Sequence, residues 1–162
     1  MQRSSSPTFE RVAGRQIAEI SMDAFDADVI IYAATPGHAL GQRVQLLFEA
    51  AADDASQHAG IGSVLLIPEV LSKPIREEKQ EVVTRLTALL SRLDLVAVDE
   101  VTAELAAAMA ATYRLRAPDA VHLATAVGSA ADRFITNNRN DFAKSISEID
   151  VIYPDELPVA AI

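Results

Sequence analysis

Apolar and polar positions along the chain form two kinds of pattern, one typical of helices and one typical of strands. Helical spacing of apolar side chains predicts helices over residues 40–58, 73–93 and 101–113, and another from Pro118 to about Ser129. Between them lie short apolar runs of strand composition. These runs are GIGSVLLIP at 60–68, DLVAVD at 94–99, DRFIT at 132–136 and DVIYP at 150–154.

Two boundaries stay open at this level. In AFDADVIIYAA, residues 24–34, propensity favours a strand over VIIY, but a strand that ends near Asp26 and runs straight into a helix is an equal alternative. Pro68 suits the first position of a helix that follows the strand before it. Whether residues 141–145 form a helical turn is also left open. Strands alternating with helices predict an α/β fold, a three-layer α/β/α sandwich with a central, mostly parallel sheet.

Composition narrows the class of protein. The chain has 162 residues, of which 50% are hydrophobic and 23% charged, as expected for one soluble globular domain over residues 22–162. Residues 1–21 are polar and are expected to form a flexible N-terminal extension. No apolar run approaches the ~20 residues that span a bilayer, and no signal-peptide pattern is found, so we expect no membrane contact and a cytoplasmic location. The chain has no cysteine, which excludes disulfides and thiolate metal sites.

The net charge of −9 bears on possible ligands. Proteins that bind nucleic acid without sequence preference depend on Lys and Arg to neutralise phosphates. The negative net charge therefore argues against a general nucleic-acid binder, unless a divalent cation supplies positive charge at the site.

Four acids stand at joints between predicted elements. Asp26, Glu69 and Asp141 follow apolar runs, and Asp119 lies in the first turn of a helix that is apolar nearly all round and therefore buried. Singly, each acid has an ordinary explanation as a turn residue or a partner of a helix dipole. Together, at the carboxyl edge of one parallel sheet, they would repel one another unless a cation compensates. Oxygen ligands without cysteine point to Mg²⁺ or Mn²⁺ rather than zinc.

Four motifs in this order resemble the PIN-domain family, and within it the VapC-type toxins of bacterial toxin–antitoxin pairs. The motifs are FDADVIIYAA, LLIPEVLS, RAPDAVHLATA and DRFITNNRNDF, and the resemblance covers about residues 22–155. It implies a small α/β/α sandwich, often dimeric, with Mg²⁺- or Mn²⁺-dependent ribonuclease activity. It also implies an RNA substrate, a homodimer and a cognate antitoxin protein that holds the enzyme inactive.

The resemblance assigns roles to particular residues. Asp26, Glu69 and Asp119 match the first three family acids, as catalytic residues and metal ligands. The fourth is Asp141, the nearest acid, because Asn138 stands where many members have an aspartate. A neutral Asn138 would weaken a second metal, which implies one metal or a site completed by RNA phosphate. Thr136, together with Asn137, is expected to shape the edge of the pocket.

Several neighbours of these acids have two explanations each. Asp28 is either a supporting residue or a solvated acid. For His122, a hydrogen-bonded buried histidine is favoured over a metal ligand. Arg114, Arg116 and Arg139 would either hold RNA phosphates or form ion pairs with nearby acids.

The leading hypothesis is therefore a metal-dependent endoribonuclease restrained by a partner protein. The alternative is a catalytically degenerate PIN domain that acts as an RNA- or protein-binding module. A phosphatase or receiver-like protein with an acidic Mg²⁺ pocket ranks third, because DADV lacks the expected surrounding lid and lysine.

Overall fold

The computed structural model describes residues 21–51 and 57–161, so all but the last residue of the predicted N-terminal extension lies outside the described residues. The strands form one five-stranded sheet in the order β3-β2-β1-β4-β5, and every neighbouring pair is parallel. The strands are β1 (Asp23–Phe25), β2 (Gly60–Ser63), β3 (Leu93–Val96), β4 (Arg133–Ile135) and β5 (Asp150–Ile152).

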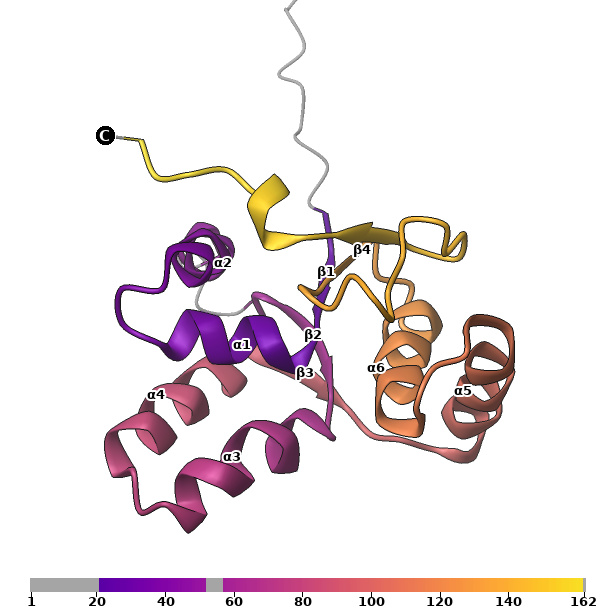
Figure 1. Cartoon of the computed structure of the whole chain (residues 1–162), viewed down its shortest axis with the longest axis horizontal. Helices are drawn as coiled ribbons and strands as arrows, with labels where there is room; N and C mark the ends of the chain where they lie inside the picture. Colours follow the sequence, from indigo (N-terminus) through magenta and orange to yellow (C-terminus); the bar gives the residue numbers. More distant parts are fainter. Residues whose placement is uncertain (1–20, 52–56, 162) are drawn as a thin grey trace, which may run out of the picture.

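Helices cover both faces of this sheet. The helices are α1 (Ala27–Ala34), α2 (Ala39–Ala50), α3 (Leu66–Arg76), α4 (Gln80–Leu90), α5 (Glu100–Tyr113), α6 (Ala117–Gly128) and the short 3₁₀ helix η1 (Pro154–Glu156). Helices α5 and α6 lie on one side of the sheet and α1 to α4 on the other (Figure 1). The predicted three-layer α/β/α sandwich is confirmed. Of the helices in the described residues, none has the length and apolar character needed to cross a membrane.

The core consists of two apolar clusters, one on each face of the sheet. In β1, Ala24 belongs to the cluster under α5 and α6, while Phe25 belongs to the cluster under α1 to α4. In β4, Phe134 and Ile135 divide in the same way. Successive strand side chains point to opposite faces. Because helices bury both faces, the last two residues of β1 and of β4 are apolar on both sides of the sheet, and the charged residues Asp23 and Arg133 stand at the first positions of these strands.

The open boundary at Asp26 is resolved in favour of the helix. Strand β1 ends at Phe25, and Asp26 is the N-cap of α1, with its carboxylate accepting a hydrogen bond from the Ala27 N–H at 2.8 Å. The side chain of an N-cap aspartate satisfies an N–H that has no partner within the helix. Capping chemistry thus overrides the strand propensity of VIIY.

Two predicted helix boundaries are wrong. The helix after β2 begins at Leu66, so Pro68 is its third residue rather than its first. The single helix predicted over residues 73–93 is two helices, because α3 ends at Arg76 and α4 begins at Gln80. Helix α3 continues through Pro74 to Arg76, and the chain then reverses at Glu78, which has a left-handed φ of 55°. Residues 141–145 form turns and bends rather than a helical turn.

Candidate active site

The acidic residues gather at the carboxyl edge of the sheet for topological reasons. Asp26 directly follows β1, and Glu69 lies in the first turn of α3, which follows β2. Helix α6 runs back to the parallel strand β4, so its first turn, with Asp119, lies at the same edge. The loop after β4 carries Asp141. Ligands bind at this edge in open parallel sheets.

Asp26 is buried and its orientation is determined from two sides. Besides the bond from Ala27, its second carboxylate oxygen accepts a hydrogen bond from the Thr136 hydroxyl at 2.7 Å. Its backbone N–H donates to the Ile135 carbonyl at 3.0 Å, which ties the end of β1 to the end of β4. Burial raises the pKa of Asp26, against the opposing effects of Thr136 and His122. The site therefore holds a carboxylate whose charge is costly.

Asp28, in the first turn of α1, is a second acid whose charged form is disfavoured by burial. One of its carboxylate oxygens accepts a hydrogen bond from the Asn137 backbone N–H at 3.0 Å. The other, Oδ1, is buried without a hydrogen-bond partner among the described residues. Burial, and then the charge of Asp26, raise the pKa of Asp28 to about 7. The alternative explanation of Asp28 as a solvated acid is thus wrong, and its supporting role in the site stays a prediction.

Asp119 borders a cavity of about 370 Å³, which is lined by Ala27, Glu69, Arg116, Pro118 and Asp119 itself. The Arg116 Nε lies 3.4 Å from Asp119 Oδ2, but the arginine side chain is 80% exposed, so this ion pair is weak. Asp119 Oδ2 is buried and accepts no hydrogen bond from the part of the chain that the structure describes. Burial raises the pKa of Asp119, and the charges of Asp141 and Glu69 add to that effect while Arg116 opposes it.

Glu69 is paired with a buried histidine. Its Oε2 lies 3.0 Å from His122 Nε2, and the His122 side chain is almost completely buried on α6. Burial alone would lower the pKa of His122, but the hydrogen bond to Glu69 and the charges of Asp26, Glu69 and Asp119 outweigh it and raise the pKa. The favoured explanation of His122 as a hydrogen-bonded buried histidine is confirmed. Its partner was not foreseen, because Glu69 and His122 are 53 positions apart.

Asn138 and Asp141 form two hydrogen bonds with each other in the loop after β4. The Asn138 side-chain N–H donates to Asp141 Oδ2 at 2.7 Å, and the Asp141 backbone N–H donates to Asn138 Oδ1 at 3.3 Å. The Asn138 backbone N–H donates to the Thr136 hydroxyl oxygen at 3.1 Å. Thr136 therefore connects this pair to Asp26. Asn138, in the place of a family acid, positions Asp141 with its neutral side chain.

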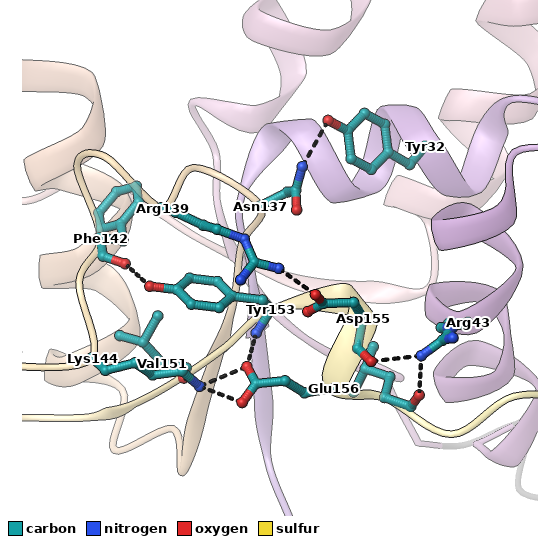
Figure 2. A network of polar contacts seen from close by, with 11 residues as sticks. Tyr32, Arg43, Asn137, Arg139, Phe142, Lys144, Val151, Tyr153, Asp155 and Glu156 are labelled. Atoms are coloured by element: carbon teal, nitrogen blue, oxygen red, sulfur yellow. Dashed lines mark hydrogen bonds and ion pairs between the residues drawn. The ribbon is translucent and has the colours of Figure 1, made fainter.

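The same loop is braced by the C-terminal segment (Figure 2). Arg139 pairs with Asp155 at 2.6 Å, and its guanidinium lies over the Tyr153 ring at 4.2 Å from the centroid. The Tyr153 hydroxyl donates to the Phe142 carbonyl at 2.7 Å. Of the two explanations for Arg139, the ion pair describes what is seen here, and the same holds for Arg116 beside Asp119. Arg114 is exposed at the end of α5.

The carboxylates of these residues are suitable ligands for a divalent cation, although in this arrangement they do not form a complete coordination site. Among the described residues, no three acidic or histidine side chains are close enough to constitute a metal site. Asp28 Oδ1 and Asp119 Oδ2 are nevertheless buried carboxylate oxygens that lack a hydrogen-bond donor in the described ranges. Such oxygens are the ligands that Mg²⁺ and Mn²⁺ prefer. A divalent cation held by these carboxylates would compensate the charges that burial disfavours.

The comparisons with known proteins concern most of the chain. A family model described as PIN domain matches residues 24–145. Among solved structures, a toxin–antitoxin complex from Klebsiella pneumoniae matches with a TM-score of 0.61 and 28% identity, covering 83% of this chain and 98% of that chain. VapBC2 from Rickettsia felis, bound to a DNA fragment from its promoter, matches with a TM-score of 0.64 over 82% of this chain and 98% of that one. At 16% identity, the second match shows the fold alone. No curated protein matches significantly.

Proposed function

We propose, on the premise that this chain belongs to the PIN-domain family, that it is a Mg²⁺- or Mn²⁺-dependent endoribonuclease. The family model covers residues 24–145, which confirms the resemblance inferred from the four motifs. Members of this family are in general nucleases that use divalent metals. The choice of RNA as substrate and the roles of individual residues belong to the proposal.

One observation carries the proposal, namely buried carboxylates that have no adequate positive partner. Asp26, Asp28 and Asp119 all have raised pKa values because burial opposes their charges. A fold does not gain stability by burying charges without compensation. Such groups gather where chemistry requires them, so their joint presence at the ligand-binding edge of the sheet supports a catalytic site.

The residues divide into three roles in this proposal. Asp26, Asp28 and Asp119 would hold the cation, and Glu69 and Asp141 would complete the site directly or through water. A bound divalent cation supplies Lewis-acid activation of a water molecule and neutralises charge on the phosphate. Thr136 and His122 orient Asp26 and Glu69, respectively, through the hydrogen bonds described above. Arg116, exposed at the rim of the cavity, is placed to bind an RNA phosphate.

We further propose that a partner protein restrains this activity. The Klebsiella pneumoniae structure is a toxin–antitoxin complex, and the match covers 98% of one chain of it. By this likeness the chain is the toxin of such a pair, and a cognate antitoxin is its partner. A homodimer remains a prediction.

The test is cleavage of a mixed RNA panel, including tRNAs, by the purified protein with Mg²⁺ or Mn²⁺. We expect cutting at discrete sites that stops when a chelator is added. Asp119→Asn keeps the size of the side chain and removes its charge, so this variant should fold and fail to cut. Cleavage by Asp119→Asn at the parent rate would show that the site is assigned to the wrong residues.

A catalytically degenerate domain is the second candidate, and Asn138 is the observation that favours it. The Asn138 side-chain N–H donates a hydrogen bond to Asp141 Oδ2, which leaves that carboxylate less available to a cation. Thermal stability separates the two candidates, because a ligand that binds the folded state raises the melting temperature. A working site gains stability from Mn²⁺, and the gain disappears in Asp119→Asn. An inert binding module gains none and cuts no RNA.

A further inference from the structure

A stacked pair of aromatic rings lies beside the acidic edge of the sheet. Tyr32, on α1, and His38, just before α2, have ring centroids 4.1 Å apart and planes inclined by only 15°. Both side chains are half-buried. Two apolar clusters form the core among the described residues, and neither includes Tyr32 or His38. The pair is therefore an ordered aromatic surface that the core does not account for.

The position of His38 is determined by the backbone around it. His38 is the N-cap of α2, and its Nδ1 accepts a hydrogen bond from the Gly41 N–H at 3.1 Å. A Cβ at position 41 would lie 2.0 Å from the Tyr32 carbonyl oxygen, so only glycine lets α2 approach α1 this closely. Gly37, with φ of +74°, makes the turn that brings the two rings together. The stack is thus preorganised.

Asn137 connects the stack to the acidic site. Its backbone N–H donates to Asp28 Oδ2 at 3.0 Å, while its side-chain N–H donates to the Tyr32 hydroxyl at 3.2 Å (Figure 2). Asp28 and Tyr32 are also four residues apart on α1, which places them on the same face of that helix. A nucleotide whose phosphate lies at the acids would therefore have a base within reach of the rings.

We propose that Tyr32 and His38 form a stacking site for one nucleobase of single-stranded RNA, next to the phosphate that is cut. This inference rests on the proposed ribonuclease function and adds the part of the substrate that the acids do not bind. Aromatic side chains hold unpaired bases by stacking, which needs no positive charge. That mode suits a chain whose net charge is −9 and whose Arg139 is engaged with Asp155.

His38 also has a free polar edge. Because Nδ1 accepts the Gly41 N–H, the proton of the neutral imidazole is on Nε2. No hydrogen bond from Nε2 is formed to any part of the chain that the structure describes. A base whose edge lies in the plane of the His38 ring, next to the stacked base, can therefore accept a hydrogen bond from Nε2, which gives the site a means to discriminate among bases.

The experiment is a cycle that changes the protein and the RNA separately. The protein carries Asp119→Asn to prevent cleavage, with or without Tyr32→Leu. The probe is a fluorescein-labelled single-stranded RNA spanning a cut site found in the panel, intact or with one base removed at each position in turn. Fluorescence anisotropy gives the Kd for each combination. His38→Asn is a second test of the stack that keeps the local structure, since asparagine preserves the N-cap of α2 and removes the ring.

With Tyr32 present, removing the base at one position should weaken binding roughly five- to a hundredfold, the range for loss of one stacked base. With Tyr32→Leu, intact RNA should bind that much more weakly, and removal of the same base should have little further effect. His38→Asn should show a smaller loss with the same dependence on that base. A purely structural role for Tyr32 would weaken all RNAs alike.

The two proposals fail in different ways. If the parent cuts RNA but the effect of base removal is the same with Tyr32 and with Tyr32→Leu, the stacking site is wrong and the ribonuclease stands. If the parent neither cuts nor binds RNA, the ribonuclease is wrong and the stacking site falls with it.

Discussion

Two aspartates at opposite ends of the same strand have opposite surroundings. Asp23, at the start of β1, and Asp26, just after its end, are each only 5% exposed. Asp23 is held by both nitrogens of the Arg133 fork, with Nε and Nη2 at 2.6 and 2.8 Å from its two oxygens. Asp26 receives hydrogen bonds from Thr136 and Ala27, and within the residues that the structure describes no arginine or lysine pairs with it.

Under the proposed function, this difference separates a structural carboxylate, Asp23, from a functional one, Asp26. Bidentate pairing with arginine compensates the buried charge of Asp23 within the fold, and this interaction raises the pKa of Arg133. At Asp26, Thr136 and His122 oppose the effect of burial but the pKa stays raised, and under the proposed function a divalent cation would supply the remaining compensation. Burial alone is therefore a poor guide to function, whereas burial without a cationic partner is informative. Each of the following experiments changes either the paired carboxylate Asp23 or the acids around Asp26.

The largest effect is expected from Arg133→Met, which leaves Asp23 buried without its partner. Removing one member of a buried ion pair costs ~3–5 kcal/mol, and we expect the lower end because the Arg133 side chain is 28% exposed. Urea unfolding measures the loss. The double variant Asp23→Asn with Arg133→Met removes the orphaned charge and should recover part of it. An equal loss in both variants would show that packing of Arg133, rather than its charge, matters.

The next effect is on activity, in Asp26→Asn. Cleavage of RNA should fall at least about a hundredfold, equivalent to ~2.7 kcal/mol in the activation barrier, because the site loses a charged ligand. Stability should stay close to that of the parent, since asparagine caps helices as well as aspartate does. Single-turnover cleavage and urea unfolding measure the two quantities. A variant that loses stability but keeps its rate would place Asp26 with Asp23 as a structural residue.

A smaller effect is expected from Mn²⁺ on the folded state. At about ten times its Kd, a ligand specific to the folded state adds ~1.4 kcal/mol to the free energy of unfolding. Differential scanning fluorimetry should show this gain in the parent and in a Glu148→Gln control, which lies outside the site. The gain should be lost in Asp119→Asn. An equal gain in all three proteins would mean that Mn²⁺ binds elsewhere.

The smallest effect concerns pH. The pKa of Asp28 is raised by burial and by Asp26 to about 7, so the folded chain binds this proton more tightly than the unfolded chain does. The stability that the protonated group contributes is full below about pH 4 and is lost as the pH rises through about 7. Asp28→Asn, which does not titrate, should therefore have a higher free energy of unfolding than the parent above about pH 8 and lose this advantage in acid. Urea unfolding with a chelator present tests this, and parallel pH profiles would contradict it.

Local pattern was sufficient for the elements and for the acids at their ends. Helix α5, which Asp99 caps, and helix α6, which has Pro118 in its first turn, lie close to where they were expected. The boundary at VIIY stayed open between a strand and a helix, and the break between α3 and α4 was missed. Asp28 was undecided, because only the burial of its carboxylate distinguishes a member of the site from a solvated acid.

The sequence by itself determined the alternation of strands and helices, and with it the edge of the sheet at which Asp26, Glu69 and Asp119 meet. Period and capping are local properties, and parallel connections bring the strand ends to one side. Only the tertiary structure decided the partners, pairing Asp23 with Arg133 across 110 positions and Glu69 with His122 across 53. Such pairs depend on how helices pack against the sheet, where a displacement of one helical turn brings a different side chain into contact, and no local pattern records that choice.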